Sequence, residues 1–585
     1  MEVKITACSP KLKVADCLYN VGQIYEEVKK ATKEGCQVVL FPELSITSCS
    51  CGSLFHYSVL LEAALAALNY LLDITSTLDI YIVVGLPIKH KQKIHNCAAI
   101  LHFGEVIAYI PKLFSKSTGI FSDYIYDSED NITPDFIFSV NDVDFKIAIG
   151  DDVESIIDSN VVILNPSSVP VVAGEYEKIK NSLLSISSGR GIISVNPSYC
   201  ESTSFSVYGG TALAILNGSV VVERKPFEKK DMYFSISGNY ERKEIEVATS
   251  SVAITKKNPF IPIDNTYEYF KEILMIQAHA LAKRIEHTRS KMMVIGISGG
   301  LDSTLTLLAC YFAALVLKRE PKECIKALSL PALGSSSRTK SNAEKLCEEL
   351  KVDFSVIDIS EAVKSHLHDI GHDGITTDAA YENSQARERT QILMDICNMV
   401  NGIMIGSGDL SELALGFTTY GGDQMSMYSI NASIPKTLVK ALVIHCGDRF
   451  GGSIKSILYD IADTPISPEL LPPIENVISQ KTEDIIGPYE LHDFFIYYMI
   501  HELMSPREIF SLALSVFSDS YSSEEILRWL EVFYTRFFMS QFKRVSLPDS
   551  PRITKISLSD FSMPSDASGI EWLNEVKNIH EEEIE

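Results

Sequence analysis

The residues best suited to chemistry lie in a short glycine turn, Ser298 to Ser303, with the sequence SGGLDS. An apolar run of strand length precedes the turn, and an apolar helical pattern follows it. Such glycines let backbone N–H groups close around an anion, and the N-terminus of the helix adds a favourable dipole. Ser298, Ser303 and Thr304 offer hydroxyl donors, whereas Asp302 suits a cation. The turn therefore predicts a phosphate-binding loop.

A simpler interpretation is a Gly/Ser turn that only caps a helix, with Asp302 and Ser303 as capping residues. The order of strand, SGGLDS and helix favours the nucleotide site over that cap. No Lys follows the glycines, so the turn is not a phosphoryl-transfer loop of the Walker type. It resembles the pyrophosphate loop of adenylating enzymes, which cleave ATP between the α and β phosphates.

The sequence beyond the loop indicates which adenylating family it is similar to. The matching segments are YENSQARERTQILMDICN, GSGDLSELALGFTTYGGDQMSMYSINASIPKTLV, DTPISPELLP, QKTEDIIGPYELHDFF and QFKRVSLPDSP. They closely resemble NAD synthetases of the larger, glutamine-dependent type over about residues 255 to 570. In that family ATP adenylates the nicotinate carboxylate of deamido-NAD, and ammonia then displaces AMP. The resemblance implies the same reaction here, with Mg²⁺ as a cofactor.

The same resemblance implies the residues of the site. It places Asp302 and Glu412 on Mg²⁺, and Lys436 and Lys543 against phosphates or the dinucleotide. The implied ATP-binding residues are Gly296, Ser298, Gly299, Gly300, Asp302, Ser303 and Ser407, and the implied deamido-NAD-binding residues are Asn383, Glu412, Phe417, Tyr420, Lys436 and Lys543. Taken singly, Glu412 is explained as an exposed helix acid, Asn383 as a cap and Tyr420 as core. As an ordered set, these residues favour the site.

Within the synthetase segment, this chain departs from the family pattern at three places. Ser407 stands where Thr is commoner and Phe417 where Trp is commoner, and both replacements are conservative. The stretch ISLSDFS before Met563 is shorter than the family's Leu-Ser-Pro-Arg-Gly-Asp-Trp segment. The sequence therefore does not predict a substrate contact from an Arg of that segment.

The first 250 residues resemble the nitrilase-type amidohydrolase domain that releases ammonia from glutamine in these enzymes. LFPELSITSCSCGSLF contains Glu43, which matches the general base, and EVIAYIPK ends in Lys112, which matches the cation near the developing oxyanion. A strand predicted to end at residue 149 reaches Gly150, where the family has its nucleophilic Cys. Covalent catalysis needs an activated nucleophile, so we expect Glu43 and Lys112 to remain as an inactive buried pair.

Other residues bear on this lost reaction. Thr118 and Asp123 stand where the family's glutamine-pocket loop has Tyr and Glu. The candidates for a relocated nucleophile are Cys49, Cys51, Cys200 and Asp151. Asp151 is the weakest of them, because a carboxylate attacks an amide poorly.

Three functions stay open from the sequence. The first is an NAD synthetase that uses free ammonia, or ammonia from a partner such as a separate glutaminase or an active paralogue. The second keeps glutamine hydrolysis through a relocated thiol. The third is a non-catalytic, nucleotide-binding subunit that assembles with an active paralogue, although the intact SGGLDS, Glu412 and Lys436 argue against it.

Two α/β domains are expected to position these residues. Residues 1–250 alternate strands with helices and contain hairpin signals at Phe103-Gly104 and Asn217-Gly218, which suits a nitrilase-like α/β/β/α sandwich. Residues 251–265 contain two Pro and two Asn and read as a linker. For residues 266–575 we expect a doubly wound parallel sheet with the nucleotide loop at the carboxyl end of a strand. Residues 576–585 read as a solvated acidic tail.

The bulk composition agrees with two soluble domains. A chain of 585 residues is too long for one hydrophobic core, and a net charge of -24 argues against a nucleic-acid partner. No signal peptide or membrane span is predicted. The 12 cysteines show no CxxC or Cys/His spacing, which indicates reduced thiols and not disulfides or zinc. We expect a cytoplasmic protein, and the resemblance alone implies a homo-oligomer.

Overall fold

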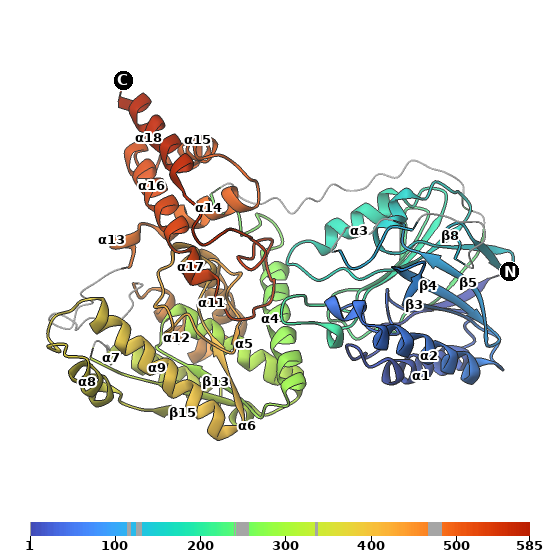
Figure 1. Cartoon of the computed structure of the whole chain (residues 1–585), viewed down its shortest axis with the longest axis horizontal. Helices are drawn as coiled ribbons and strands as arrows, with labels where there is room; N and C mark the ends of the chain where they lie inside the picture. Colours follow the sequence, from blue (N-terminus) through green and yellow to red (C-terminus); the bar gives the residue numbers. More distant parts are fainter. Residues whose placement is uncertain are drawn as a thin grey trace. The chain divides into compact units, whose positions relative to one another are not determined.

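The computed structural model describes residues 2–113, 119–124, 132–238, 240, 257–333, 337–465 and 482–584. The chain forms two compact units, Met1–Ser251 and Val252–Glu585 (Figure 1). Residues 251–256 of the predicted linker, along with Thr118, lie outside the described residues.

Unit 1 contains two six-stranded sheets. The first has the strand order β12-β1-β2-β3-β4-β5, and the second has the order β11-β10-β9-β8-β7-β6. The strands of the first sheet are β1 (Val3–Ala7), β2 (Val38–Leu40), β3 (Tyr81–His90), β4 (Lys93–His102), β5 (Glu105–Pro111) and β12 (Tyr233–Ile236). Those of the second are β6 (Ile137–Val140), β7 (Val143–Ile147), β8 (Val162–Pro166), β9 (Gly191–Val195), β10 (Ala212–Leu216) and β11 (Ser219–Arg224).

Three apolar layers hold unit 1 together. Buried residues of both sheets, such as Val83 and Leu164, form one core between them. Helices α1 (Cys17–Lys33) and α2 (Ser58–Thr75) cover the outer face of the first sheet. Helix α3 (Tyr176–Ser185) covers the second sheet through Leu183. The predicted α/β/β/α sandwich is therefore confirmed, and Phe103-Gly104 and Asn217-Gly218 do connect the hairpins β4–β5 and β10–β11.

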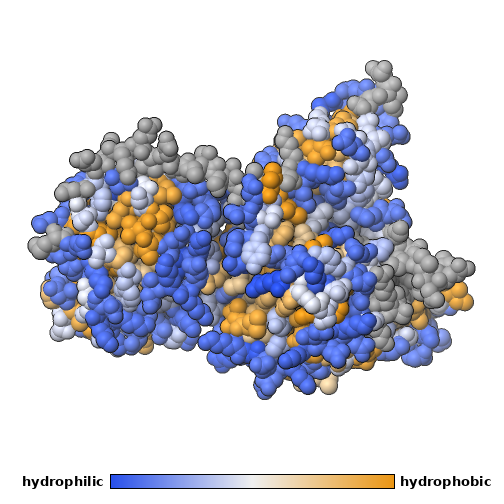
Figure 2. Space-filling view, turned by 180° about the vertical axis from the view of Figure 1, so that it is seen from behind, coloured by the Kyte–Doolittle hydropathy of each residue, from blue (hydrophilic) through white to orange (hydrophobic). Residues whose placement is uncertain are grey.

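The face seen in Figure 2 is mostly polar, with smaller apolar patches on both units. Among the described residues, α2 is the one helix long and apolar enough to cross a membrane by length and composition. Its Leu60, Ala64, Leu68 and Leu71 are buried in the core that it shares with α1. This face of α2 is therefore covered by protein.

Unit 2 is built on one parallel sheet with the strand order β15-β14-β13-β16-β17. Its strands are β13 (Met292–Gly296), β14 (Ile325–Ser329), β15 (Asp353–Val356), β16 (Gly402–Gly406) and β17 (Tyr428–Ser429). The chain moves outward from β13 to β14 and β15, and then returns to the other side of β13 as β16. The strand order therefore reverses between β13 and β16, which is where such sheets bind ligands.

Helices cover both faces of this sheet, as a doubly wound fold requires. Helices α8 (Ser360–Asp369) and α9 (Ala379–Val400) pack on β13, β14 and β16 through Val294, Leu328 and Met404. Helix α5 (Leu301–Leu317) packs on β13 and β14 together with α4 (Thr266–Thr288) and α11 (Lys436–Phe450). The remaining helices near the sheet are α6 (Pro321–Cys324), α7 (Ser337–Glu349), α10 (Leu410–Leu415) and α12 (Gly452–Ala462).

The chain ends in a bundle of helices, and here one prediction was wrong. The bundle contains α13 (Thr482–Ile486), α14 (Tyr489–Ile500), α15 (Pro506–Phe517), α16 (Ser523–Met539), α17 (Gln541–Arg544) and α18 (Ile570–Ile584). Residues 576–584, expected to be a solvated acidic tail, continue α18. Val576 and Ile579 are buried, and Glu582 pairs with Arg507 at 2.7 Å. Two apolar residues at helical spacing outweigh the surrounding charge.

Candidate functional site

The predicted phosphate loop has the expected strand–turn–helix form. β13 ends at Gly296, the turn follows, and α5 begins at Leu301. Gly299 has φ +88°, a backbone conformation that is strained for any residue with a side chain. The turn is internally braced, because the Ser298 N–H donates to Ser303 Oγ at 3.3 Å and the Gly300 N–H donates to Ser298 Oγ at 3.2 Å.

A second loop leaves the neighbouring strand at the same edge of the sheet. β16 ends at Gly406, Ser407 follows, and Asp409 caps α10 by accepting the Glu412 N–H at 2.9 Å. Because β13 and β16 are parallel neighbours at the reversal point, the two loops face each other. This arrangement places the side chain of Glu412 close to that of Asp302.

Three carboxylates converge on one buried ammonium group. Lys436 Nζ lies 2.7 Å from Asp302 Oδ2, 2.6 Å from Asp409 Oδ2 and 2.8 Å from Glu412 Oε1. Only 2% of the Lys436 side chain and none of the Asp409 side chain is exposed. The alternative explanation of Glu412 as an exposed helix acid is therefore wrong. We call Asp302, Asp409 and Glu412 the acid cluster.

The charges of this cluster do not cancel, because three carboxylates face one ammonium. Burial raises the pKa of Glu412 to about 7, although Lys436 opposes the rise. Burial also raises the pKa of Asp409 well above its ordinary value. Burial alone would lower the pKa of Lys436, but the three carboxylates raise it well above the usual range and keep the ammonium charged. The excess negative charge favours either a proton or an added cation.

The acid cluster fits a divalent cation. One ligand oxygen from each of Asp302, Asp409 and Glu412 can lie within 4.8 Å of the others. Asp302 Oδ1 is buried, and no group in the described part of the chain donates a hydrogen bond to it. Hard carboxylate oxygens are the ligands that Mg²⁺ prefers. Asp302 and Glu412 were predicted as the metal ligands, and the geometry adds Asp409.

Sequence reasoning missed Asp409, although a signal was present. GSGDLSEL places an Asp three residues before Glu412, at the position where a helix cap is expected. A capping Asp normally faces solvent. Here the cap lies at the ligand edge of the sheet, so its second oxygen joins the cluster.

Asn431 connects the two loops, and sequence reasoning missed it as well. Its side-chain amide is fully buried. Asn431 Nδ2 donates hydrogen bonds of at most 3.3 Å to the Asp302 carbonyl, Thr306 Oγ1 and the Ser407 carbonyl. Gln277 of α4 donates to Asn431 Oδ1 at 2.9 Å and thereby orients this amide. The loop after β13 and the loop after β16 are therefore held as one body.

Asp493 of α14 fixes the start of α11, where Lys436 lies. Its Oδ2 accepts the Thr437 N–H at 2.9 Å and the Thr437 hydroxyl at 2.7 Å, and its Oδ1 accepts from Ser411 Oγ. The Lys436 N–H in turn donates to Ser411 Oγ at 2.9 Å. Burial raises the pKa of Asp493 to about 6 despite these hydrogen bonds.

The remaining predicted residues gather around the turn that follows α10. Asn383 Oδ1 accepts the Thr419 hydroxyl at 2.8 Å, whereas α9 is capped by Asp378, so Asn383 is not a cap. Lys543 Nζ donates to the carbonyls of Gly416 and Thr418 at 2.8 and 2.7 Å. Tyr420 is 48% exposed, which excludes the core explanation. The turn 416–420 is thus joined to α9 and α17.

In unit 1, Glu43 follows β2 at a tight contact between two segments. A Cβ on Gly85 would lie 2.1 Å from the Leu44 nitrogen, so only glycine lets β3 pass this close. Leu44 itself has φ +55°. The Gly85 N–H donates to Ser45 Oγ at 3.1 Å and holds the segment in place.

Glu43 and Lys112 form the predicted buried pair. Lys112 Nζ lies 2.9 Å from Glu43 Oε1, which also accepts from Asn96 Nδ2 at 2.5 Å. Ser168 Oγ donates to Glu43 Oε2 at 2.9 Å. The Lys112 N–H donates to the Asn96 carbonyl at 2.8 Å, so β4 positions both members of the pair.

Gly150 lies directly beside this pair. A Cβ built on it would be 2.8 Å from Lys112 Nζ and 3.4 Å from Glu43 Oε2. β7 ends at Ile147, two residues earlier than predicted. Asn165 Nδ2 donates to the carbonyls of Ala148 and Gly150 at 2.7 and 2.9 Å, which takes these carbonyls out of strand pairing. The three residues converge, but glycine offers no reacting atom.

Two of the three candidate replacement thiols, Cys49 and Cys51, are poorly prepared for attack. Burial raises the pKa of Cys49 well above its ordinary value, and the charge of Glu201 raises it further. Burial raises the pKa of Cys51 to about 12. The thiolate is the reactive form of cysteine, so both groups stay protonated and weakly nucleophilic near neutral pH.

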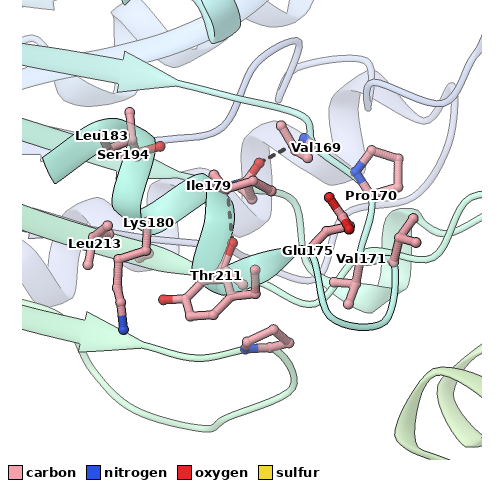
Figure 3. Close-up of a pocket in the computed structure, with 15 residues that line it drawn as sticks. Val169, Pro170, Val171, Glu175, Ile179, Lys180, Leu183, Ser194, Thr211 and Leu213 are labelled. Atoms are coloured by element: carbon pink, nitrogen blue, oxygen red, sulfur yellow. Dashed lines mark hydrogen bonds between the residues drawn. The ribbon is translucent and has the colours of Figure 1, made fainter. Parts of the chain in front are cut away.

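Unit 1 also contains a pocket of about 490 Å³, measured with its open mouth, between α3 and strands β9 and β10 (Figure 3). Ile179, Leu183 and Leu213 make it largely apolar. Lys180 at its edge is paired with Glu177 at 2.6 Å. Neither Glu43, Lys112 nor Gly150 lines this pocket, so it is separate from their site.

Each of the two units contains a segment that matches a known protein family. Residues 273–519 match the NAD synthase family, and residues 4–118 match the carbon-nitrogen hydrolase family. A glutamine-dependent NAD(+) synthetase of Mycobacterium leprae is 29% identical over 99% of this chain and 98% of that protein. The corresponding protein of Aquifex aeolicus is 24% identical over 94% of this chain and 98% of its own length.

Solved structures share the fold over both units. A glutamine-dependent NAD(+) synthetase from Cytophaga hutchinsonii superposes with a TM-score of 0.78 at 17% identity, covering 98% of this chain and all of that chain. One from Acinetobacter baumannii, solved in complex with ADP, has a TM-score of 0.67 at 20% identity and covers 96% and 97%.

Proposed function

This chain belongs to the two-domain, glutamine-dependent NAD synthetases, a family of ligases, and we propose that it amidates deamido-NAD to NAD with ATP and ammonia. In the proposed reaction the nicotinate carboxylate attacks the α-phosphorus of ATP, and pyrophosphate leaves. Ammonia then adds to the acyl adenylate, loses a proton and expels AMP. One ATP is consumed for each amide formed.

The acid cluster on Lys436 is the observation that carries this proposal. It adjoins the Ser298–Ser303 loop at the reversal point of a parallel sheet, where phosphates and their counter-ions are bound. A purely structural role would not require three carboxylates around one buried ammonium, since buried ion pairs add little to stability.

The roles of the residues follow from their chemistry. Backbone N–H groups of Gly299 and Gly300, with the hydroxyls of Ser298 and Ser303, are assigned to the phosphates of ATP. Asp302 and Glu412, with Asp409, would hold Mg²⁺, which offsets the charge of the phosphates and of the leaving pyrophosphate. The ammonium of Lys436 adds fixed positive charge at the same place.

The ammonia is proposed to come from outside unit 1 of this chain. Gly150 lies where a nucleophile would meet Lys112 and Glu43, and it has no side chain. Loss of the nucleophile cost about a million-fold in kcat in a serine hydrolase. Unit 1 then serves folding or assembly, and the nitrogen donor is free ammonia or a partner enzyme.

The test is a comparison of two nitrogen donors with the purified full-length protein. With deamido-NAD, ATP and MgCl₂, ammonium chloride is expected to give equal amounts of NAD and AMP. Glutamine at the same concentration is expected to give less than about 1% of that rate, because no thioester can form. Glutamine-driven turnover comparable with the ammonium rate would overturn the assignment of the nitrogen source.

The two other hypotheses predict different results. A relocated thiol predicts that a glutamine-like diazo ketone labels one cysteine of unit 1, and mass spectrometry identifies the site. The raised pKa of Cys49 argues against such labelling. A non-catalytic subunit predicts ATP binding without any ammonium-driven NAD formation.

A further inference from the structure

Arg536 is a half-buried cation in the last turn of α16. In the described part of the chain, no carboxylate pairs with it and no carbonyl accepts a hydrogen bond from its side chain. Its guanidinium carbon lies 5.6 Å from the centroid of the Phe417 ring. Burial lowers the pKa of Arg536, which reflects the loss of water around the group. Guanidinium groups that burial removes from water are normally paired with an anion.

The ring beneath Arg536 belongs to the nucleotide edge of unit 2. The Phe417 N–H donates to the Glu412 carbonyl at 3.0 Å, so the ring follows directly on the helix that carries Glu412. Lys543 donates hydrogen bonds to the carbonyls on both sides of Phe417. Burial lowers the pKa of Lys543, and the positive charge of Arg536 lowers it further. Two cations therefore flank the same turn.

Tyr489 supplies a second group without a partner. It is 2% exposed, and no described group makes a hydrogen bond with its hydroxyl. Lys436 Nζ lies 5.2 Å from the centroid of its ring. Burial raises the pKa of Tyr489, and the charges of the acid cluster raise it further. The unpaired hydroxyl therefore belongs to a side chain that packs against Lys436 at the acid cluster.

Two ordinary explanations of Arg536 are incomplete. A cation in the last turn of a helix is stabilised by the helix dipole, and the face of an aromatic ring attracts a guanidinium. Both effects explain an exposed Arg equally well. Neither supplies the hydrogen-bond acceptors that a half-buried guanidinium loses with its water, and neither explains the unpaired Tyr489 hydroxyl at the acid cluster.

We propose that Arg536, supported by the face of Phe417, binds an anionic group of the dinucleotide substrate. This inference rests on the proposed function. A planar guanidinium forms paired hydrogen bonds with a carboxylate or with a phosphate, and deamido-NAD contains both. The nicotinate carboxylate is the group lost in forming NAD, whereas the pyrophosphate is common to substrate and product.

The test measures dissociation constants on the full-length protein for deamido-NAD, NAD and ATP by calorimetry. Arg536→Gln is expected to weaken deamido-NAD binding by about 10- to 100-fold, the usual effect of losing hydrogen bonds to a charged group. ATP binding is expected to stay within twofold of the unmodified protein. Arg528→Gln is the matched control, because Arg528 is exposed on the same helix and stacks on Trp529. Arg536→Lys, which keeps the charge without the planar fork, is expected to be intermediate.

The two anions give different results. If Arg536 binds the carboxylate, NAD affinity stays unchanged in Arg536→Gln; if it binds the pyrophosphate, NAD affinity falls by the same factor. Deamido-NAD binding within twofold of the unmodified protein would overturn the inference, and so would an equal loss of ATP binding, which indicates a structural role. Failure of the unmodified protein to bind deamido-NAD would instead contradict the proposed function.

Discussion

Lys436 Nζ lies 2.6 Å from Asp409 Oδ2, and the two side chains are at most 2% exposed. This contact joins the first residue of α11 to the cap of α10. Each charge was removed from water and is compensated by the other, so neither is dispensable alone. The pair therefore links the stability of unit 2 to the electrostatics of its proposed active site.

Lys436→Met is expected to destabilise unit 2 by about 3–5 kcal/mol, because three carboxylates, of which Asp409 is fully buried, lose their ammonium. MgCl₂ is expected to restore part of this loss, since a divalent cation replaces the missing charge. Urea unfolding followed by tryptophan fluorescence measures this effect. Both tryptophans of the chain, Trp529 and Trp572, lie in unit 2 and report on it alone. Lys455→Met, at an exposed pair that solvent screens, is the control and is expected to leave the stability of unit 2 nearly unchanged.

Asp409→Asn tests the residue that the geometry adds to the predicted metal ligands. Asn caps a helix as well as Asp does, so the start of α10 is retained while one charge is lost. The Mg²⁺ concentration for half-maximal ammonium-driven turnover is expected to rise about tenfold or more. Asp519→Asn, on an exposed turn, serves as the comparison. An unchanged Mg²⁺ dependence would remove Asp409 from the site.

Asp493→Asn tests the buried carboxyl that holds α11. Its pKa rises from 3.8 to about 6 on folding, so the folded protein binds more protons between these values. The cost of ionising Asp493 is therefore absent below about pH 4, grows through this window and is complete above about pH 6. The stability of the unmodified protein relative to Asp493→Asn should fall by at most about 3 kcal/mol as pH rises from 4 to 7.

Urea unfolding of both proteins across this range, followed by tryptophan fluorescence, gives the difference. Carboxyl groups that both proteins share contribute equally to the two stabilities, so their contributions cancel in the difference. A difference that stays constant with pH would show that Asp493 is not forced to ionise in the folded protein.

Gly150→Cys restores a thiol beside Lys112 and Glu43. A Cβ there would lie 2.8 Å from Lys112 Nζ, whose charge lowers the pKa of a thiol. A glutamine-like diazo ketone is therefore expected to label position 150 in this variant only, as measured by mass spectrometry. The fit is imperfect, because Gly150 has φ +55° and Lys112 must move. Gly150→Ala, which adds the Cβ without the sulfur, separates strain from chemistry.

The sequence was most informative where chemistry and local structure coincide. The SGGLDS turn, Glu412 and Lys436 were predicted together, and they do converge. Asn431 and Asp493 were not predicted. Asn431 contacts Asp302 across 129 positions and Asp493 contacts Thr437 across 56, and no local spacing records such contacts.

α18 shows the opposite difficulty. Its charged residues outnumber the two buried apolar ones that attach it to the bundle, so composition alone suggested a solvated tail. Packing, which depends on the position of an apolar residue on a helix face, decided the outcome.

The amide of Gln277 sets a limit on how the chain can be shortened. It lies midway along α4, the first helix after the linker, and it orients the Asn431 amide that both loops share. A fragment beginning at β13 would keep the whole parallel sheet and every proposed ligand. It would leave Asn431 without its only side-chain donor in the described chain, and the two loops free to separate. The smallest autonomous synthetase fragment therefore starts before Thr266, at the linker and not at the sheet.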